Sequence, residues 1–181
     1  KLLLFGSMKI TDKRKGIDYL IEACKLLAQQ EPELSKQLGV VVLGSQAEQC
    51  KSLFPFPIYP MNYVSNEKEL VDIYNAVDLY VTPSLQDNLP NTIVEAMACG
   101  IPCVGFNVGG IPQMIDHLHN GYVAQYKSAD DLANGICWTL TEGDYETLSS
   151  EAYRKAVTTY SEATVASQYI QIYNHITGKN A

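Results

Sequence analysis

The chain has 181 residues, of which 46% are hydrophobic, a composition that suits one globular domain with a substantial core. The 13 lysines and arginines are outnumbered by 20 aspartates and glutamates, and the net charge of −7 argues against a nucleic-acid-binding protein, which would need a basic face. The five cysteines are widely spread and fit reduced, buried thiols better than a zinc knuckle or disulfide framework, and no apolar run reaches the length of a membrane span.

The chain begins with a predicted strand, a basic loop and a helix. Residues 2–6 form a short apolar run typical of a buried parallel strand. From Ile17, apolar residues recur at helical spacing as far as Ala28. The loop between these elements holds four of the 13 basic residues, which are Lys9, Lys13, Arg14 and Lys15. A solvated loop explains such charges in general, but this one lies at the carboxyl end of a strand, where parallel sheets bind ligands.

Two further strands and a helix follow. Residues 39–44 read as a second parallel strand, and a third, short strand begins at residue 58. Residues 67–76 form a predicted helix that Ser65 or Asn66 caps. The apolar face of this helix consists of Leu70, Val71, Ile73 and Tyr74.

A strand–loop–helix–strand unit occupies the middle of the chain. It consists of a strand at 77–82, a polar loop at 83–90, a helix at 91–99 and a strand at 102–106. Pro83 cannot donate to a sheet ladder and ends the first strand, and Gly100 stops the helix. The unit is half of a parallel α/β repeat, which binds ligands at the carboxyl ends of its strands.

Two carboxylates stand in this unit. Asp87 lies in the polar loop and Glu95 lies one turn into the helix, eight positions later. Loop carboxylates can accept hydrogen bonds from sugar hydroxyls, whereas the free N–H groups and the dipole of a helix N-terminus suit a phosphate. The residues therefore indicate a ligand that is part polyol and part phosphate.

The remaining elements complete an α/β pattern. They are a short helix at 111–115, a strand at 121–124, and amphipathic helices at 128–140, 145–160 and 162–176. The last helix carries an apolar stripe, Tyr169, Ile172, Tyr173 and Ile176, which in the simplest interpretation packs against the sheet. The alternation of strands and helices predicts an α/β fold with a mostly parallel sheet of about six strands.

The central stretch also carries a family resemblance. Residues 83–104 read P-S-x-x-D-N-x-P-N-x-x-x-E-A-M-A-C-G-x-P-C-V, and G-G-I-P follows at 109–112. This pattern resembles the donor-binding signature of the retaining glycosyltransferases of family 4, which have the GT-B fold. The resemblance covers the chain to about residue 175 and implies a Rossmann-like three-layer α/β/α domain, the C-terminal donor-binding half of a GT-B enzyme.

The resemblance implies a role for each site residue. Glu95 would bind the ribose hydroxyls of a nucleoside-diphosphate sugar, Asp87 would bind the transferred sugar, and Lys15, in a K-G-x-x-x-L-x-x-A segment, would neutralise the diphosphate. These three are the candidate catalytic residues. The full set of candidate donor-binding residues is Lys15, Val64, Asp87, Asn88, Leu89, Asn91, Thr92 and Glu95, with Val64 near the base. No cofactor or metal is expected, since the charge is met by amino acids and the chain has no Asp-x-Asp motif.

Two positions depart from the family pattern. The arginine that usually follows the glycine of the first strand is Ser7 here, so that Lys9 or Arg14 would have to replace it. An arginine binds phosphate in a bidentate way, so its loss is not neutral. The first of the two family glutamates is Asp87 here, one methylene shorter, which bears on the choice of sugar.

Three other interpretations of the sequence compete with this one. A glycosidase also uses two carboxylates, but here they stand beside phosphate-binding groups. A dinucleotide-dependent oxidoreductase would need a Gly-x-Gly-x-x-Gly after the first strand, which is absent. A nucleotide-sugar binding module without turnover stays open as an alternative, because the family's acceptor site belongs to its first domain.

Further expectations concern the whole protein. The chain opens directly on a strand, and in the family that it resembles this strand opens the second of two domains. The resemblance therefore implies that residues 1–181 are the second domain of a longer protein, with the helix at 162–176 packing toward an N-terminal acceptor domain. That domain would bind a polysaccharide, a lipid-linked or another glycan acceptor, and the whole enzyme would transfer a hexose-type sugar to it from a nucleotide such as UDP. The chain alone would then bind donor without transfer. We expect a cytoplasmic protein, with peripheral membrane association of the full-length form.

Overall fold

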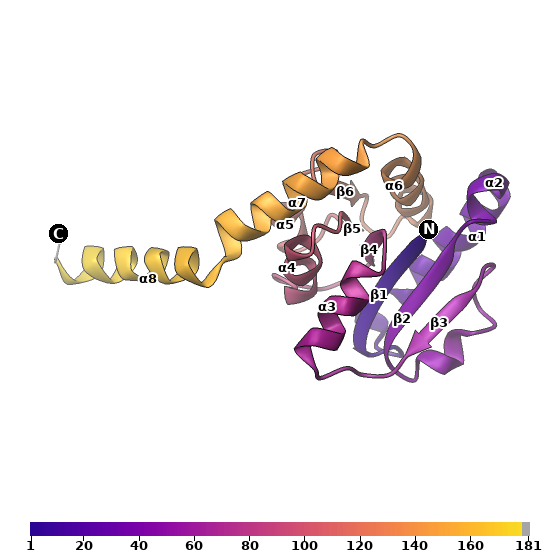
Figure 1. The fold of residues 1–181 in the computed structure, drawn as a ribbon, viewed down its shortest axis with the longest axis horizontal. Coiled ribbons are helices and arrows are strands. Elements are labelled where there is room, and N and C mark those ends of the chain that lie inside the picture. Colours follow the sequence, from indigo (N-terminus) through magenta and orange to yellow (C-terminus); the bar gives the residue numbers. More distant parts are fainter. Residues whose placement is uncertain (179–181) are drawn as a thin grey trace.

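The computed structural model describes residues 1–178, which fold around one six-stranded sheet with the strand order β3-β2-β1-β4-β5-β6 (Figure 1). All five strand pairs are parallel. The strands are β1 (Leu2–Lys9), β2 (Gly39–Ser45), β3 (Ile58–Met61), β4 (Leu79–Thr82), β5 (Cys103–Phe106) and β6 (Gly121–Ala124). The predicted α/β class and the number of strands are confirmed.

Helices cover both faces of the sheet and make a three-layer α/β/α domain. One buried cluster joins the sheet to α1 and α6, and a second joins it to α3, α4, α5 and α7. The helices are α1 (Ile17–Gln30), α2 (Pro32–Ser35), α3 (Glu67–Asn75), α4 (Asn91–Ala98), α5 (Ile111–Met114), α6 (Ala129–Thr141), α7 (Tyr145–Tyr160) and α8 (Glu162–Thr177), with short 3-10 helices η1 (Lys13–Lys15) and η2 (Ala47–Cys50).

The central strand β1 shows why these strands are apolar throughout. Successive side chains of a strand point to opposite faces, and both faces of this sheet are covered. Leu3 and Phe5 therefore join the cluster of α1 and α6, whereas Leu4 joins that of α3 and α4. All three are at most 1% exposed.

The side on which the chain adds new strands to the sheet changes between β1 and β4. From β1 the chain proceeds outward to β2 and β3 on one side, and from β4 it proceeds to β5 and β6 on the other. Leu4 pairs with Val41 of β2 on one side and with Tyr80 of β4 on the other. The helices that follow β1 and β4, which are α1 and α4, belong to the buried clusters on opposite faces of the sheet. At such a point doubly wound sheets form a ligand crevice at the carboxyl ends of the strands.

Some details differ from the sequence-based expectations. Strand β1 continues past Gly6 to Lys9 through an irregularity in its pairing with β2. Asn66, not Ser65, caps α3, and its side chain accepts from the Glu69 N–H at 3.1 Å. Val71 was predicted on the buried face of α3 but is 45% exposed, because the helix buries a narrower stripe around Ile73.

The cysteines carry no disulfide. All five are free. Cys24, Cys50 and Cys103 are buried as predicted, whereas Cys99 and Cys137 are partly exposed. Burial raises the pKa of the Cys24 and Cys103 thiols, which keeps them protonated.

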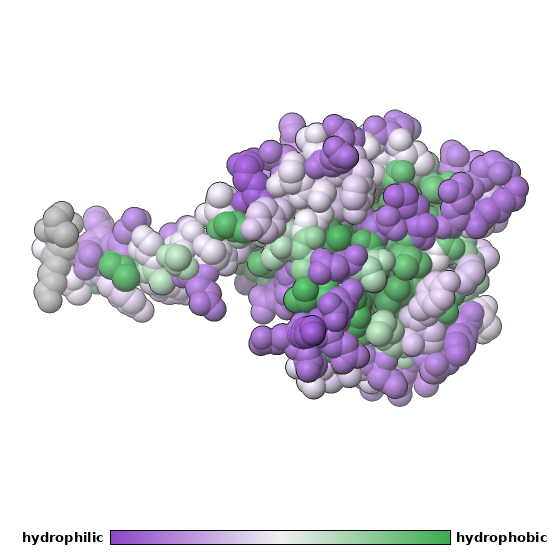
Figure 2. Space-filling view, viewed as in Figure 1, coloured by the Kyte–Doolittle hydropathy of each residue, from purple (hydrophilic) through white to green (hydrophobic). Residues whose placement is uncertain are grey.

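The last helix, α8, projects away from the domain (Figure 1) and has no buried residue. Figure 2 shows apolar residues among polar ones along this projecting arm. The predicted stripe does not pack against the sheet; its exposed fractions are 57% for Tyr169, 54% for Ile172, 61% for Tyr173 and 73% for Ile176. None of the helices in residues 1–178 has the length and apolar character needed to cross a membrane.

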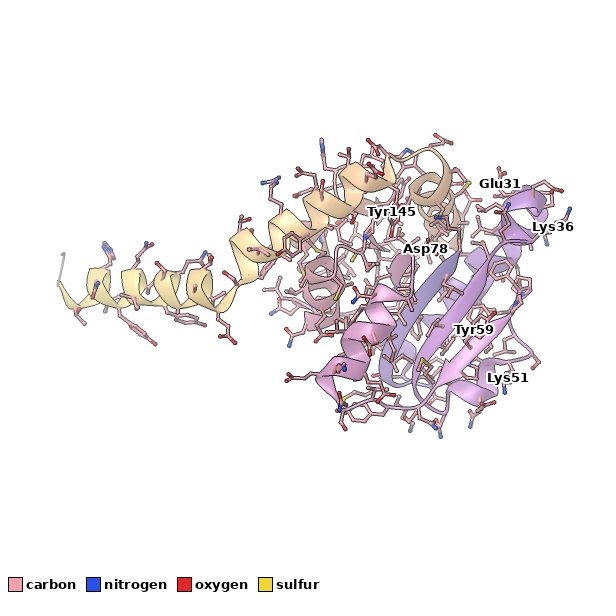
Figure 3. The ribbon with its side chains drawn as sticks, viewed as in Figure 1. Glu31, Lys36, Lys51, Tyr59, Asp78 and Tyr145 are labelled. Carbon is pink, nitrogen blue, oxygen red and sulfur yellow. The ribbon has the colours of Figure 1, made fainter. Side chains whose placement is uncertain are left out.

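Hydrogen bonds fix the amino end of the sheet, opposite the crevice. The Asp78 carboxylate accepts from the Leu2 N–H at 2.7 Å, and the Tyr145 hydroxyl of α7 donates to the Asp78 carbonyl at 3.0 Å. Figure 3 shows Asp78 and Tyr145 close together there, while Tyr59 lies on the edge strand β3. Although burial opposes it, the hydrogen bond from Leu2 lowers the pKa of the Asp78 carboxyl.

Candidate functional site

Two loops meet at the carboxyl ends of β1 and β4. Gly16 has a φ of 72°, and a Cβ at this position would overlap the Pro83 carbonyl oxygen, so only glycine allows the close approach. Next to this contact, the Leu85 N–H donates to the Arg14 carbonyl at 2.7 Å. The basic loop after β1 is thus fixed against the polar loop after β4.

This contact brings Lys15 to Asp87. The Lys15 ammonium lies 2.6 Å from Asp87 Oδ2, and the two side chains are 33% and 15% exposed. Ser84, which is 1% exposed, donates to the same carboxylate oxygen at 3.3 Å. Sequence reasoning had placed Lys15 on a phosphate and Asp87 on a sugar; the structure adds that they form an ion pair with each other.

Two glycines hold the Asp87 loop from behind. Gly109 has a φ of 57°, and a Cβ there would overlap the Asp87 carbonyl oxygen. A Cβ on Gly110 would likewise overlap the carbonyl oxygen of Asn88. The glycine pair in the predicted signature therefore sets the position of the loop that carries the candidate sugar ligands.

The helix α4 points its N-terminus into the crevice. Pro90 precedes it and accepts from the Ile93 N–H at 3.0 Å. The N–H groups of Asn91 and Thr92, which come first in the helix, have no backbone acceptor within residues 1–178. N–H groups of this kind at the start of a helix can bind an anion.

Glu95 lies one turn further along α4 and contacts α3. The Tyr74 hydroxyl donates to Glu95 Oε2 at 2.9 Å. Tyr74 is 2% exposed, and its ring lies edge-on to that of Tyr80 with centroids 6.2 Å apart. Burial raises the pKa of the Tyr74 hydroxyl, so that it stays protonated and remains a donor.

Glu95 lines a cavity of about 230 Å³, here called the Glu95 cavity. Its walls are mostly apolar and come from β1, β2, β4, α3, α4 and the loop before α3. They consist of Leu4, Gly6, Ser7, Met8, Leu43, Gly44, Tyr63, Val64, Leu70, Tyr74, Tyr80, Thr92 and Glu95. The structure therefore places Val64, Thr92 and Glu95 around one cavity. A flat apolar group with a hydroxyl-bearing neighbour would match this lining.

A second cavity of about 440 Å³, the Lys15 cavity, adjoins the first. The two share Gly6, Ser7, Met8, Tyr80 and Thr92, so they lie side by side, and together they are here called the cleft. Cations dominate the charged lining of the Lys15 cavity, which consists of Lys9, Asp12, Arg14 and Lys15. A polyanion would match this half of the cleft.

The cations of the Lys15 cavity are not equivalent. Arg14 binds Asp12 through two bonds of 3.1 and 2.8 Å, and these bonds lower the pKa of the Asp12 carboxyl. Lys9 forms no ion pair with any residue of the described chain. Of the two candidates for the role of the absent arginine at Ser7, Lys9 is therefore the less encumbered.

Other predicted residues lie at the rim. Leu89 and Asn91 line a third cavity of about 390 Å³, which Glu95 also lines, and Asn88 is exposed on the loop. A groove of about 590 Å³ between α3, α4 and α7 is lined by none of the candidate donor-binding residues. Within residues 1–178 no three His, Cys, Asp or Glu side chains gather in a way that could hold a metal ion.

Sequence reasoning missed two partners of the carboxylates. Tyr74 was placed on an apolar helix face, and only its hydroxyl could have indicated a polar role there. Ser84 lies within the signature, but nothing in its spacing predicts that it is buried against Asp87.

Comparisons with known proteins give the family context. Residues 1–142 match the profile of the family described as Glycosyl transferases group 1. An uncharacterized glycosyltransferase of Haemophilus influenzae is 29% identical over 125 residues, which make up 67% of this chain and 35% of that protein. A D-inositol 3-phosphate glycosyltransferase of Saccharomonospora viridis is 26% identical over 170 residues, 88% of this chain and 39% of that protein. The chain thus spans well under half the length of these curated relatives.

Solved structures share the fold. The C-terminal domain of a glycosyl transferase group 1 family protein (LpcC) from Francisella tularensis matches with a TM-score of 0.71 and 21% identity over 89% of this chain and 86% of that chain. Anabaena Alr3699/HepE, in complex with UDP and glucose, matches with a TM-score of 0.75 and 22% identity over 96% of this chain and 48% of that chain.

Proposed function

The chain belongs to the glycosyl transferases group 1 family, and we propose that it is the donor-binding domain of a retaining, family 4 glycosyltransferase that transfers a hexose-type sugar from a nucleoside diphosphate. One observation carries this proposal above the others. A single cleft runs from an apolar end beside Glu95 to a cationic end beside Lys15. A base, a ribose and a diphosphate follow one another in the same order along a nucleotide.

The base and ribose would occupy the Glu95 cavity. Val64 and Tyr63 supply an apolar surface for the base, and the Glu95 carboxylate can accept from the ribose hydroxyls. UDP is the proposed nucleotide, a choice supported by the UDP complex of the Anabaena protein.

The diphosphate would occupy the Lys15 cavity. Lys15, Lys9 and the N-terminus of α4 all present positive charge or N–H donors to it. These groups bind more strongly as charge grows on the departing phosphate, which is how they would accelerate transfer. We expect no metal requirement, because these residues can meet the phosphate charge.

The transferred sugar would lie against Asp87, with Asn88 and Leu89 beside it. A diphosphate that draws Lys15 toward itself would leave the Asp87 carboxylate to accept from sugar hydroxyls. The ion pair therefore supports a model in which one nucleotide sugar contacts both residues, with its diphosphate on Lys15 and its sugar on Asp87.

The acceptor would bind outside this chain. The stripe of α8 exposes four large apolar side chains, a surface that suits burial against another domain. The match to a C-terminal domain over most of both chains supports a place after an N-terminal acceptor domain. We also propose that the acceptor is a glycan or a lipid-linked glycan and that only the full-length protein transfers sugar to it. The full-length protein would be cytoplasmic and would associate peripherally with a membrane.

Calorimetric titration tests the proposal directly. The full chain is titrated with UDP, GDP, ADP and their hexose conjugates, in EDTA and again in Mg²⁺. We expect saturable binding of one diphosphate in both buffers, with at least tenfold weaker binding by Glu95→Gln, because a neutral amide accepts more weakly than a carboxylate. Failure of the chain to bind any of these nucleotides would contradict a donor site. Binding without transfer, even by the full-length protein, would favour the non-catalytic module.

A further inference from the structure

Tyr74 differs from the other residues of the cleft because its hydroxyl contacts Glu95, the residue that is proposed to bind the ribose. Its hydroxyl donates to Glu95 Oε2 at 2.9 Å and lies 3.4 Å from the Thr92 carbonyl oxygen. Both acceptors belong to the first turns of α4, whereas Tyr74 belongs to α3. The contact therefore ties the carboxylate to a neighbouring helix.

The surroundings fix the position of this hydroxyl. Tyr74 is 2% exposed and lies in the buried cluster with Leu4, Ile93 and Met97. Its ring contacts that of Tyr80 edge-on. A packed ring cannot follow a moving partner, so the hydroxyl is a fixed point for Glu95.

A free glutamate would lack such a constraint. Its terminal torsion is broad, so the carboxylate of an unsupported side chain samples many orientations. The bond from Tyr74 occupies one acceptor position on Oε2 and leaves Oε1 and the remaining lone pair of Oε2 for other donors. Two adjacent hydroxyls on a ribose need such a pair of acceptors.

We propose that Tyr74 is a positioning residue for nucleotide recognition, whose hydroxyl orients the Glu95 carboxylate to accept from both hydroxyls of the ribose. This inference rests on the proposed function, because it takes Glu95 as the ribose ligand. It extends that function by assigning to α3 a residue that acts through Glu95 and selects ligands with an intact ribose diol.

A double-mutant cycle tests the inference. Binding of UDP and of 2′,3′-dideoxy-UDP is measured for the wild-type chain, Tyr74→Phe, Glu95→Gln and the double variant; the guanosine or adenosine pair is used if the nucleotide titration selects that base. Tyr74→Phe removes one oxygen and keeps the ring. We expect it to weaken UDP binding about fivefold to tenfold, close to the net value of one ordinary hydrogen bond, and to leave the dideoxy analogue unchanged. In the Glu95→Gln background the same change should have no further effect on UDP.

A matched control separates positioning from stability. Tyr145→Phe also removes a hydroxyl that donates a single part-buried hydrogen bond, but at the opposite end of the sheet. It should leave both nucleotides bound as in the wild type. Equal losses for UDP and its dideoxy analogue in Tyr74→Phe, or additive losses in the double variant, would overturn the inference while the donor site stands. Absence of UDP, GDP and ADP binding by the wild type would instead overturn the proposed function, and this inference with it.

Discussion

The Lys15 ammonium and the Asp87 carboxylate, 72 positions apart in the chain, lie 2.6 Å from each other beside the Lys15 cavity. The two residues are expected to bind different parts of one donor, yet they neutralise each other in the structure. Any phosphate that binds Lys15 must compete with Asp87 for it. The strength of the ion pair therefore sets part of the affinity of the site.

Asp87→Asn should separate the two ligands of the cleft. The change frees Lys15 from its carboxylate partner, so UDP alone should bind up to about fivefold tighter, the upper end of the value of a partly exposed ion pair. A UDP-hexose should gain less or bind more weakly, because the sugar loses a charged acceptor. Calorimetric titration of both ligands measures the difference. A parallel loss for UDP and UDP-hexose would contradict the predicted roles.

Lys15→Gln should weaken UDP binding about tenfold, since it removes a charged donor from the phosphate. Lys13→Gln is the matched control, because it removes the same charge two positions away. The Lys13 side chain is 78% exposed and pairs with Asp18. Its effect on the dissociation constant should be about twofold at most, through long-range attraction that salt screens. Similar losses in both variants would show that the loop acts only through its total charge.

Gly16→Ala should destabilise the domain more than a change of conformation alone explains. Gly16 and Gly100 both have a φ of 72°, but a Cβ at Gly16 meets the Pro83 backbone whereas one at Gly100 meets only the movable Ser149 hydroxyl. We expect the free energy of unfolding to fall by about 3 kcal/mol for Gly16→Ala and about 1 kcal/mol for Gly100→Ala. Urea denaturation measures both; equal losses would refute the close approach of the two loops.

Asp78→Asn should reduce stability in a pH-dependent way. The folded-state pKa of Asp78 is lowered, so its contribution is present above the unfolded value of about 3.9 and is lost as the pH falls through the folded value. At pH 7 we expect a loss of about 1 kcal/mol, because an amide accepts more weakly from Leu2. As the pH falls below about 4, the difference between the variant and the wild type should shrink, and it should vanish only below the lowered folded-state pKa.

Asp72→Asn provides the control for this experiment. Asp72 is exposed on α3, and its carboxylate accepts no hydrogen bond within residues 1–178. Its unfolding free energy should stay within about 0.5 kcal/mol of the wild type at both pH values. A constant difference for Asp78→Asn across the same range would show that its effect is not electrostatic.

The apolar stripe of α8 should contribute little to the stability of the domain. Replacing both Tyr173 and Ile176 by serine should change the unfolding free energy by less than about 0.5 kcal/mol, because neither is buried. Ile136→Ala, which empties a fully buried site on α6, should lower it by about 2–5 kcal/mol. Fluorescence of Trp138, the single tryptophan, follows the unfolding of the domain. A large loss from the serine variant would show that α8 packs against the domain in solution.

Periodicity was enough to predict the architecture. Buried parallel strands carry unbroken apolar runs and their helices carry amphipathic stripes, so the order of elements could be read along the chain. The stripe of α8 shows where this reasoning fails. Helical spacing shows that one face is apolar but does not show what covers it, and in α8 no part of the described chain does.

The candidate site was predicted in its members but not in its contacts. Lys15, Asp87 and Glu95 could be named from their motifs, but motifs do not show that Lys15 pairs with Asp87 or that Tyr74 supports Glu95. These contacts join loops and helices that only the packed sheet brings together. A phenylalanine would fit the apolar stripe of α3 as well as Tyr74 does. Helical spacing therefore could not predict that the Tyr74 hydroxyl has a polar partner.

The order of the strands has a consequence for folding kinetics. The two halves of the sheet meet where Leu3 pairs with Leu79 and Leu4 with Tyr80, over 70 positions apart in the chain, whereas β5 and β6 pair within about 20 positions. Contacts this distant form late because a long loop must close first. The cleft spans that junction, so a chain in which only one half of the sheet has folded lacks the nucleotide site. Nucleotide binding should therefore appear only with the slowest folding phase in a stopped-flow experiment, and bound nucleotide should slow unfolding of the whole sheet rather than of one half.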